Sequence, residues 1–136
     1  MIYTPEIRFA DIDSYGILHN AKYLIYFEQS RIHLFNKIAG DWDWQKNGVL
    51  VASQKIEYKI PVKLCDKLEV EVWVKKVGKK SITIAYKAYK VEGSERYLSA
   101  ESETVLVCFN PISNKTVDVP ILWRESIDKF DLMTRT

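Results

Sequence analysis

The apolar residues of this chain follow one spacing near the N-terminus and another over the rest of its length. After Asn20 they recur every three or four residues, which predicts an amphipathic helix from Ala21 to Ala39, ended by Gly40. The expected buried stripe consists of Leu24, Phe27, Leu34, Phe35 and Ile38. From Val49 onward apolar and polar residues alternate, which indicates strands with one buried face.

The strand pattern predicts the class of fold. A loosely alternating stretch, Ile2 to Phe9, is expected to form an edge strand because Pro5 lacks a backbone N–H. The alternating segments that follow the helix are 49–60, 67–77, 81–91, 97–109 and a short 116–119. Gly78 and Gly93 mark hairpin turns, and Pro120 is placed to open a short C-terminal helix. An antiparallel sheet of five to six strands can bury its one apolar face only against the long helix. We therefore expect a single α+β domain, residues 1–136, with a curved sheet wrapped around a central helix.

Two charged residues, Glu28 and Arg31, interrupt the apolar side of the predicted helix. A buried charge must be paired and hydrogen-bonded, so these residues either satisfy each other or hold a polar network near the helix. We expect them to support the structure. Ile25 and Ile32 fall on the opposite side, where they are either isolated exposed residues or contacts with a partner subunit.

Composition narrows the classes of function. The 136 residues carry a net charge of +2, which is too small to indicate a nucleic-acid partner. Cys65 and Cys108 lack the paired spacing of metal ligands and only two histidines are present, so neither a metal nor another cofactor is expected. No apolar run approaches the length of a membrane helix and the first residues lack a signal-peptide profile, so we expect a cytoplasmic protein. A lysine cluster, residues 75–80, could meet phosphates or form a solvated hairpin end.

The polar residues just before the helix are candidates for chemistry. Asn20 is a favoured N-cap residue, and the backbone N–H groups of a helix start can polarise a carbonyl oxygen. Gly16 permits a tight turn that folds the loop back, so Asp13 could face the group that these N–H groups polarise. The alternative is that Asp13 only hydrogen-bonds its own backbone in the turn.

The run that carries these residues has a specific resemblance. The pattern D-x-D-x-x-G-x-x-x-N-x-x-Y-x-x-Y-x-E-x-x-R is similar to the signature of hotdog-fold acyl-CoA thioesterases of the 4-hydroxybenzoyl-CoA thioesterase type. Its residues here are Asp11, Asp13, Gly16, Asn20, Tyr23, Tyr26, Glu28 and Arg31. A second block matches at Tyr58, Pro61 and Asp66, and the similarity extends from Ile7 to about Pro120.

The resemblance implies roles for individual residues in hydrolysing an acyl-CoA to a free acid and coenzyme A. Asp13 matches a catalytic carboxylate that acts as nucleophile or general base, and Asn20 matches the residue whose backbone N–H polarises the thioester carbonyl. The residues expected to line the substrate site are Gly16, His19, Tyr23, Tyr26 and Tyr58. Asp11 is expected to shape the loop, together with Gly16.

The resemblance also implies partners and leaves two alternatives. Such enzymes pair strands between subunits, so a homodimer or homotetramer with sites at the interface is expected. Lys59, Lys63 or the cluster at residues 75–80 could bind the phosphates of coenzyme A. The acyl group could instead be carried by acyl carrier protein, or the chain could be a non-catalytic acyl-binding module. A dehydratase is disfavoured because its helical histidine pattern is missing.

Overall fold

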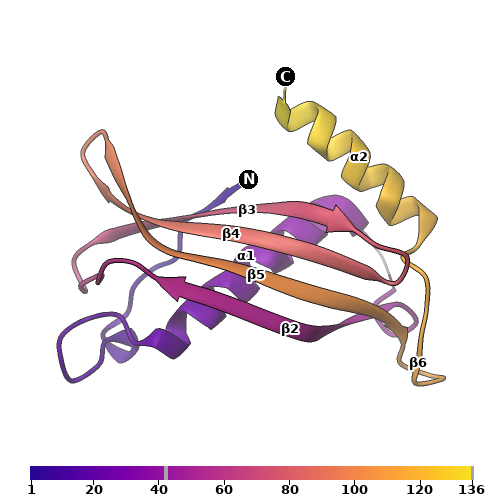
Figure 1. Ribbon diagram of the computed structural model, residues 1–136, viewed down its shortest axis with the longest axis horizontal. Helices are drawn as coiled ribbons and strands as arrows, with labels where there is room; N and C mark the ends of the chain where they lie inside the picture. Colours follow the sequence, from indigo (N-terminus) through magenta and orange to yellow (C-terminus); the bar gives the residue numbers. More distant parts are fainter. Residues whose placement is uncertain (42, 136) are drawn as a thin grey trace.

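The structure is a computed structural model that describes residues 1–41 and 43–135, with side chains described up to Asp131. Its helices are the 3₁₀ helix η1 (Phe9–Asp11), α1 (Asn20–Ala39) and α2 (Ile121–Arg135). Its strands are β1 (Ile2–Tyr3), β2 (Gly48–Tyr58), β3 (Lys67–Val77), β4 (Ser81–Glu92), β5 (Glu95–Asn110) and β6 (Lys115–Thr116). Figure 1 shows the four long strands side by side, with α1 crossing behind them.

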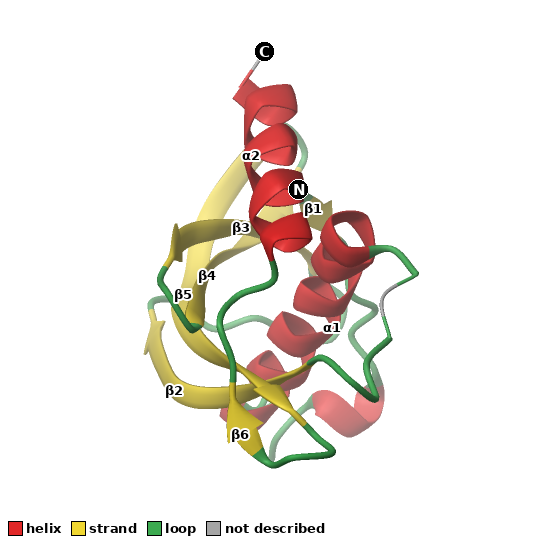
Figure 2. Cartoon of the chain, turned by 90° about the vertical axis from the view of Figure 1, so that its right-hand side faces the viewer, coloured by secondary structure: helices red, strands yellow, loops and turns green. Residues whose placement is uncertain are grey.

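One antiparallel sheet curves around α1. The strand order is β1-β3-β4-β5-β2, and β6 pairs with the end of β5. Figure 2 shows the curved sheet on one side of α1, with α2 reaching away at one end. These elements give the α+β architecture that the alternation and the single long helix predicted, and the curved sheet around one helix is the hotdog arrangement that the resemblance implied.

The core lies between α1 and the concave face of the sheet. On β3 the residues Leu68, Val70 and Val72 point into it, and on β4 Ile82 and Ile84 do so, as their alternation predicted. The helix contributes the residues Tyr23, Tyr26, Phe27, Ser30, Leu34, Phe35 and Ile38. The long strands agree with the predicted segments to within two residues at either end.

Strand β2 forms an edge of the sheet and has little cover. It pairs with β5 on one side only, and Leu50 and Val51 are 54% and 51% exposed. An edge strand with exposed apolar side chains is prone to pair with another chain. The structure therefore leaves β2 as an edge strand with exposed apolar side chains.

Helix α2 covers the end of the core near the C-terminal part of α1. Trp123 and Ile127 are buried, and the Trp123 ring lies 5.8 Å from that of Phe35 on α1. Arg124 donates a hydrogen bond to the carbonyl oxygen of Gly78, which ties α2 to the β3–β4 turn. No helix in the described part of the chain is both long and apolar enough to cross a membrane.

Two local predictions were wrong. The expected strand over residues 2–9 is limited to Ile2–Tyr3, because the chain then leaves the sheet and forms η1, where Asp11 accepts the N–H of Arg8. Leu24 was expected in the buried stripe but is 40% exposed. The helix is rotated so that Tyr23 faces the sheet in its place.

Candidate functional site

A short hairpin loop, residues 11–18, precedes α1. Ile12 and Leu18 form an antiparallel bridge, and the Asp13 N–H donates to the Ile17 carbonyl at 2.8 Å. The Gly16 N–H closes the turn on the Asp13 carbonyl at 3.0 Å, and Gly16 has a φ of 79°. A residue with a side chain would be strained there, which accounts for the glycine.

Asp13 lies at the tip of this loop and has one engaged oxygen. Its Oδ1 accepts the N–H groups of Tyr15 at 2.8 Å and Ile17 at 3.3 Å. The local turn that the sequence allowed as an alternative is therefore present. Within the described part of the chain nothing donates to Oδ2, and the residue is only half-buried. The turn orients the carboxylate and leaves one oxygen available.

The start of α1 differs by one residue from the prediction. His19, not Asn20, is the N-cap: its Nδ1 accepts the N–H of Ala21 at 3.0 Å. The His19 carbonyl accepts the N–H of Lys22 at 2.9 Å. Among the described residues no acceptor is bonded to the N–H of Asn20. Asn20 therefore enters the helix as its first residue and keeps a free backbone donor.

Asp11, at the base of the loop, is buried and fully engaged. Its carboxylate accepts the Tyr26 hydroxyl at 2.6 Å and the Arg8 N–H at 3.1 Å, and Lys22 lies 3.9 Å away. Burial raises the pKa of Asp11, but these hydrogen bonds and the Arg8 charge outweigh it, so the net shift is downward. Burial and the Asp11 bond raise the pKa of Tyr26. The Tyr26 hydroxyl thus supports the loop through its bond to Asp11.

Two tyrosines adjoin the first turn of α1. The Tyr58 hydroxyl, at the end of β2, donates to the Asn20 carbonyl at 3.0 Å. Its ring lies edge-on to that of Tyr23 at 5.4 Å, and Tyr23 is buried whereas Tyr58 is 46% exposed. Burial raises the pKa of both hydroxyls. Tyr58 joins the helix start to the edge strand and faces solvent there.

Glu28 and Arg31 lie away from this junction. The Arg31 side chain is 12% exposed and donates to the Tyr86 hydroxyl on β4 at 3.1 Å, whereas Glu28 is largely exposed and 3.9 Å from Arg31. Arg31 is eleven residues beyond Asn20 along α1, about 16 Å at 1.5 Å per residue. The structure therefore gives Arg31 a supporting contact between helix and sheet.

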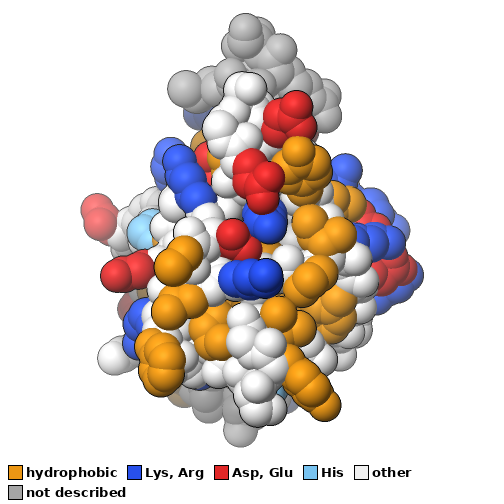
Figure 3. Space-filling view, turned by 90° about the vertical axis from the view of Figure 1, so that its left-hand side faces the viewer, with side chains coloured by type: hydrophobic (Ala, Val, Ile, Leu, Met, Phe, Trp, Pro, Cys, Tyr) orange, Lys and Arg blue, Asp and Glu red, His pale blue; other side chains and the backbone are white. Residues whose placement is uncertain are grey.

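The surface near the helix start is apolar. Figure 3, which faces this end of the molecule, shows apolar side chains around a small group of charged ones. Exposed apolar residues of the adjoining segments are Tyr58, Ile60, Leu64 and Tyr97. A hollow of about 490 Å³ lies elsewhere, on the outer sheet face between Lys55, Trp73 and Ala85. That hollow lies on the side of the sheet away from α1, so we do not assign it to this junction.

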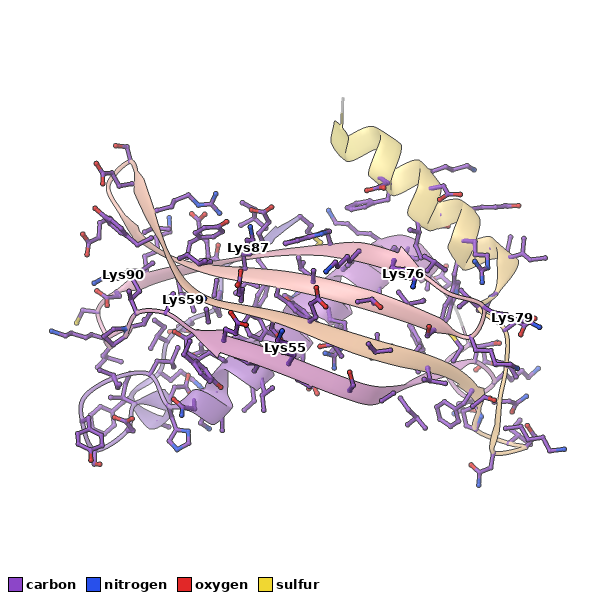
Figure 4. All side chains as sticks on the ribbon, viewed as in Figure 1. Lys55, Lys59, Lys76, Lys79, Lys87 and Lys90 are labelled. Atoms are coloured by element: carbon purple, nitrogen blue, oxygen red, sulfur yellow. The ribbon has the colours of Figure 1, made fainter. Side chains whose placement is uncertain are left out.

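The candidate phosphate-binding lysines fall into two groups at opposite ends of the sheet. Figure 4 places Lys59 at the end where β2 finishes, and Lys76 and Lys79 at the end near α2. Lys59 is paired with Glu57 at 3.0 Å, whereas within the described part of the chain no carboxylate lies within 4.0 Å of the Lys63 side chain. The cluster at residues 75–80 therefore lies far from the helix start of its own chain.

The sequence is similar to a family of known proteins over most of its length. The family model of the thioesterase-like superfamily matches residues 7–129. An uncharacterized protein from Bacillus subtilis (strain 168), YsmA, is 31% identical over 112 residues, which cover 82% of this chain and 74% of YsmA. A putative acyl-CoA thioesterase of the same organism, YneP, is 28% identical over 82% of this chain and 81% of its own.

Solved structures have the same fold. A thioesterase from Thermus thermophilus, complexed with coenzyme A and Zn, has a TM-score of 0.81 and 28% identity, over 94% of this chain and 91% of its own. A DHNA-CoA thioesterase from Staphylococcus aureus has a TM-score of 0.84 and 22% identity, over 98% and 92%. At 22% identity, the similarity to the Staphylococcus aureus structure shows only a shared fold. Among the described residues, no group of three or more His, Cys, Asp or Glu could hold a metal ion.

Proposed function

The chain belongs to the thioesterase-like superfamily, and on this premise we propose that it hydrolyses acyl-CoA thioesters to a carboxylic acid and coenzyme A. Two similar proteins support this substrate: YneP is named a putative acyl-CoA thioesterase, and the Thermus enzyme was solved with coenzyme A. An assay of this activity therefore uses both aliphatic and aromatic acyl groups.

One observation carries the proposal. The loop holds the Oδ2 of Asp13 and the helix start holds the N–H of Asn20, and neither group has a described partner. Beside them, the His19 Nδ1, the His19 carbonyl and the Asp11 carboxylate each accept a hydrogen bond. Asp13 is half-buried and Asn20 is exposed, so both groups are open to water and can exchange that water for a bound ligand.

We assign these two groups complementary roles. The Asn20 N–H binds the thioester carbonyl oxygen, which becomes negatively charged when the carbon is attacked. One such donor in a dry site lowers the barrier by about 3 to 4 kcal/mol. The Asp13 carboxylate either attacks the carbonyl carbon or removes a proton from the attacking water. In both routes the carbon–sulfur bond breaks and coenzyme A leaves as the thiolate. When Asp13 is the nucleophile, water then hydrolyses the acyl–aspartate anhydride, which releases the acid and restores the carboxylate.

The proposed site lies at a subunit interface. We propose that β2 pairs with β2 of a second copy, because its outer edge is free among the described strands and Leu50 and Val51 are exposed. Tyr58 at the end of β2 then adjoins both the partner and the helix start. Val51→Lys should convert the dimer to a monomer in sedimentation measurements. Ile112→Lys is the matched control, because Ile112 is 76% exposed on a distant turn.

Lys63 is the proposed contact for the coenzyme A phosphates. It follows Val62, whose carbonyl accepts the N–H of Leu18 at 2.7 Å, so it adjoins the loop. Lys63→Gln should raise KM for acyl-CoA about threefold without changing kcat, as expected for an exposed charge contact. Lys79→Gln, at the far end of the sheet, should leave KM unchanged. Equal effects of the two variants would refute the assignment.

The experiment that tests the function is thiol release from short, medium, long and aromatic acyl-CoA substrates. The unaltered protein is compared with Asp13→Asn. Asp43→Asn is the matched control, since Asp43 also accepts the N–H two residues ahead, at 3.0 Å from Gln45, but lies after α1. Activity that is lost only in Asp13→Asn supports the proposal. If the protein hydrolyses no acyl-CoA but does hydrolyse an acylated acyl carrier protein, the carrier protein is the substrate. If it hydrolyses neither, the result favours a non-catalytic acyl-binding module.

A further inference from the structure

We infer that His19 is a positioning residue. It caps α1 by accepting the N–H groups of Ala21 and Lys22, so that the Asn20 N–H is the one in the first turn without a described acceptor. The inference rests on the proposed function, because it assigns that N–H to the thioester oxygen. The sequence suggested only that His19 lines the site. The hydrogen bonds described for the first turn of α1 assign it a more specific role.

His19 uses both of its acceptors on the residues that follow. A helix start leaves its first N–H groups without intrahelical partners. The imidazole Nδ1 takes the N–H of Ala21 at 3.0 Å, and the His19 carbonyl takes that of Lys22 at 2.9 Å. Asn20, between His19 and Ala21, is left as a donor of this turn without a described acceptor. The cap therefore selects which N–H can meet a ligand.

His19 is itself held in place. Its N–H donates to the Asp11 carbonyl at 2.9 Å, and the Asp11 side chain is buried against Tyr26. On the other side, Tyr58 donates to the Asn20 carbonyl at 3.0 Å. The peptide group that carries the Asn20 N–H is therefore held on both sides. His19 is bonded to the loop, and Asn20 is bonded through its carbonyl to Tyr58 at the sheet edge.

The cap requires a particular protonation state. Nδ1 can accept a hydrogen bond only when it carries no proton, so the neutral ring has its proton on Nε2. Acid adds a proton at Nδ1, so that both ring nitrogens become donors. The protonated ring has no acceptor, and its charge lies at the positive end of the helix dipole. Acid should therefore release the Ala21 N–H and loosen the first turn.

The charged groups around His19 do not compensate for this loss. From the loop, Asp11 is already neutralised by Arg8 and Lys22. On the β2–β3 connection, Lys63 follows Val62, whose carbonyl accepts the Leu18 N–H, and it brings a positive charge, not a negative one. Asp13 has its Oδ1 on the backbone of the turn and makes no described contact with His19. Tyr58 contributes a neutral hydroxyl.

The test compares His19→Ala with His19→Asn. Asparagine is a strong N-cap that does not titrate, so it should restore what alanine removes. His19→Ala should lower kcat about fivefold with little change in KM, the loss expected for one helix cap. His19→Asn should recover kcat and should lack the acid fall of kcat that is expected for the unaltered protein. His33→Ala is the control, since His33 is exposed on α1 and stacks on Tyr3.

A measurement without substrate separates the two proposals. In the unaltered protein, the amide resonance of Ala21 should shift together with the titration of the His19 ring. An unresponsive Ala21 amide, or full kcat with an unchanged pH profile in His19→Ala, would overturn the positioning role. If Asp13→Asn kept full activity while the His19 variants behaved as expected, the assignment of Asp13 would fall and that of His19 would stand. A protein without thioesterase activity would overturn the proposed function and the catalytic sense of the cap.

Discussion

The base and the tip of the loop before α1 hold two carboxylates in opposite ways. At the base, Asp11 is 1% exposed and accepts hydrogen bonds from Tyr26 and Arg8. At the tip, Asp13 is half-buried and has one oxygen without a described donor. The two residues are separated in sequence only by Ile12. The Asp11 carboxylate, which supports the loop, therefore has hydrogen bonds to both oxygens, whereas the Asp13 carboxylate, which is proposed to react, has one oxygen without a described donor.

The largest expected effect is on activity at the tip. Asp13→Asn keeps an oxygen for the turn but removes the negative charge, so kcat should fall about a hundredfold or more. The free energy of unfolding should stay within about 0.5 kcal/mol of the unaltered protein, because the residue is not a core contact. Acyl-CoA assays and urea denaturation measure the two quantities. A variant with normal kcat would remove Asp13 from the mechanism.

The base should show the reverse pattern. Asp11→Ala leaves the Tyr26 hydroxyl and the Arg8 N–H without their acceptor, so the free energy of unfolding should fall by about 2 to 3 kcal/mol. The kcat of Asp11→Ala should fall less than that of Asp13→Asn, because it is affected only through a displacement of the loop. Urea denaturation of this variant, of Tyr26→Phe and of the double variant gives the energy of the bond by a double-mutant cycle. Additive effects would show that the bond contributes nothing.

Acid should destabilise the base specifically. The pKa of Asp11 is lowered in the folded state from an ordinary value of 3.8, so its stabilising contribution is present above that value. This contribution is lost as the pH falls through the lower pKa of the folded state. Between about pH 6 and pH 3, the unaltered protein should therefore lose more stability than Asp11→Asn. Thermal unfolding at a series of pH values measures this difference, and parallel curves would contradict it.

The smallest expected effect is at the contact between the loop region and the sheet edge. Tyr58→Phe keeps the ring beside Tyr23 but removes the hydrogen bond to the Asn20 carbonyl. One exposed hydrogen bond contributes about 1 kcal/mol, so kcat should fall no more than about fivefold. Steady-state kinetics of the variant measure this. A fall as large as that of Asp13→Asn would mean that the hydroxyl takes part in the chemistry.

The order of the helices and long strands could be predicted from the amino-acid pattern alone. Alternation predicted β3 over its full length, and the three- and four-residue spacing predicted α1 to within one residue. These signals are local, because a strand or helix that buries one face must repeat its apolar residues at its own period. The motif from Asp11 to Arg31 likewise marked the loop and helix start as the region of interest.

Only the tertiary structure decided which groups at that region are free. His19 and not Asn20 caps the helix, the Tyr26 hydroxyl is taken by Asp11, and the cluster at residues 75–80 lies at the opposite end of the sheet. Each outcome depends on how the loop, the helix and the sheet are placed against one another, as in the bond from Tyr58 to Asn20 across 38 residues of sequence. The spacing of residues along the chain does not predict the distances between side chains of the loop, the helix and the sheet, because the direction of a side chain depends on the segment that it packs against.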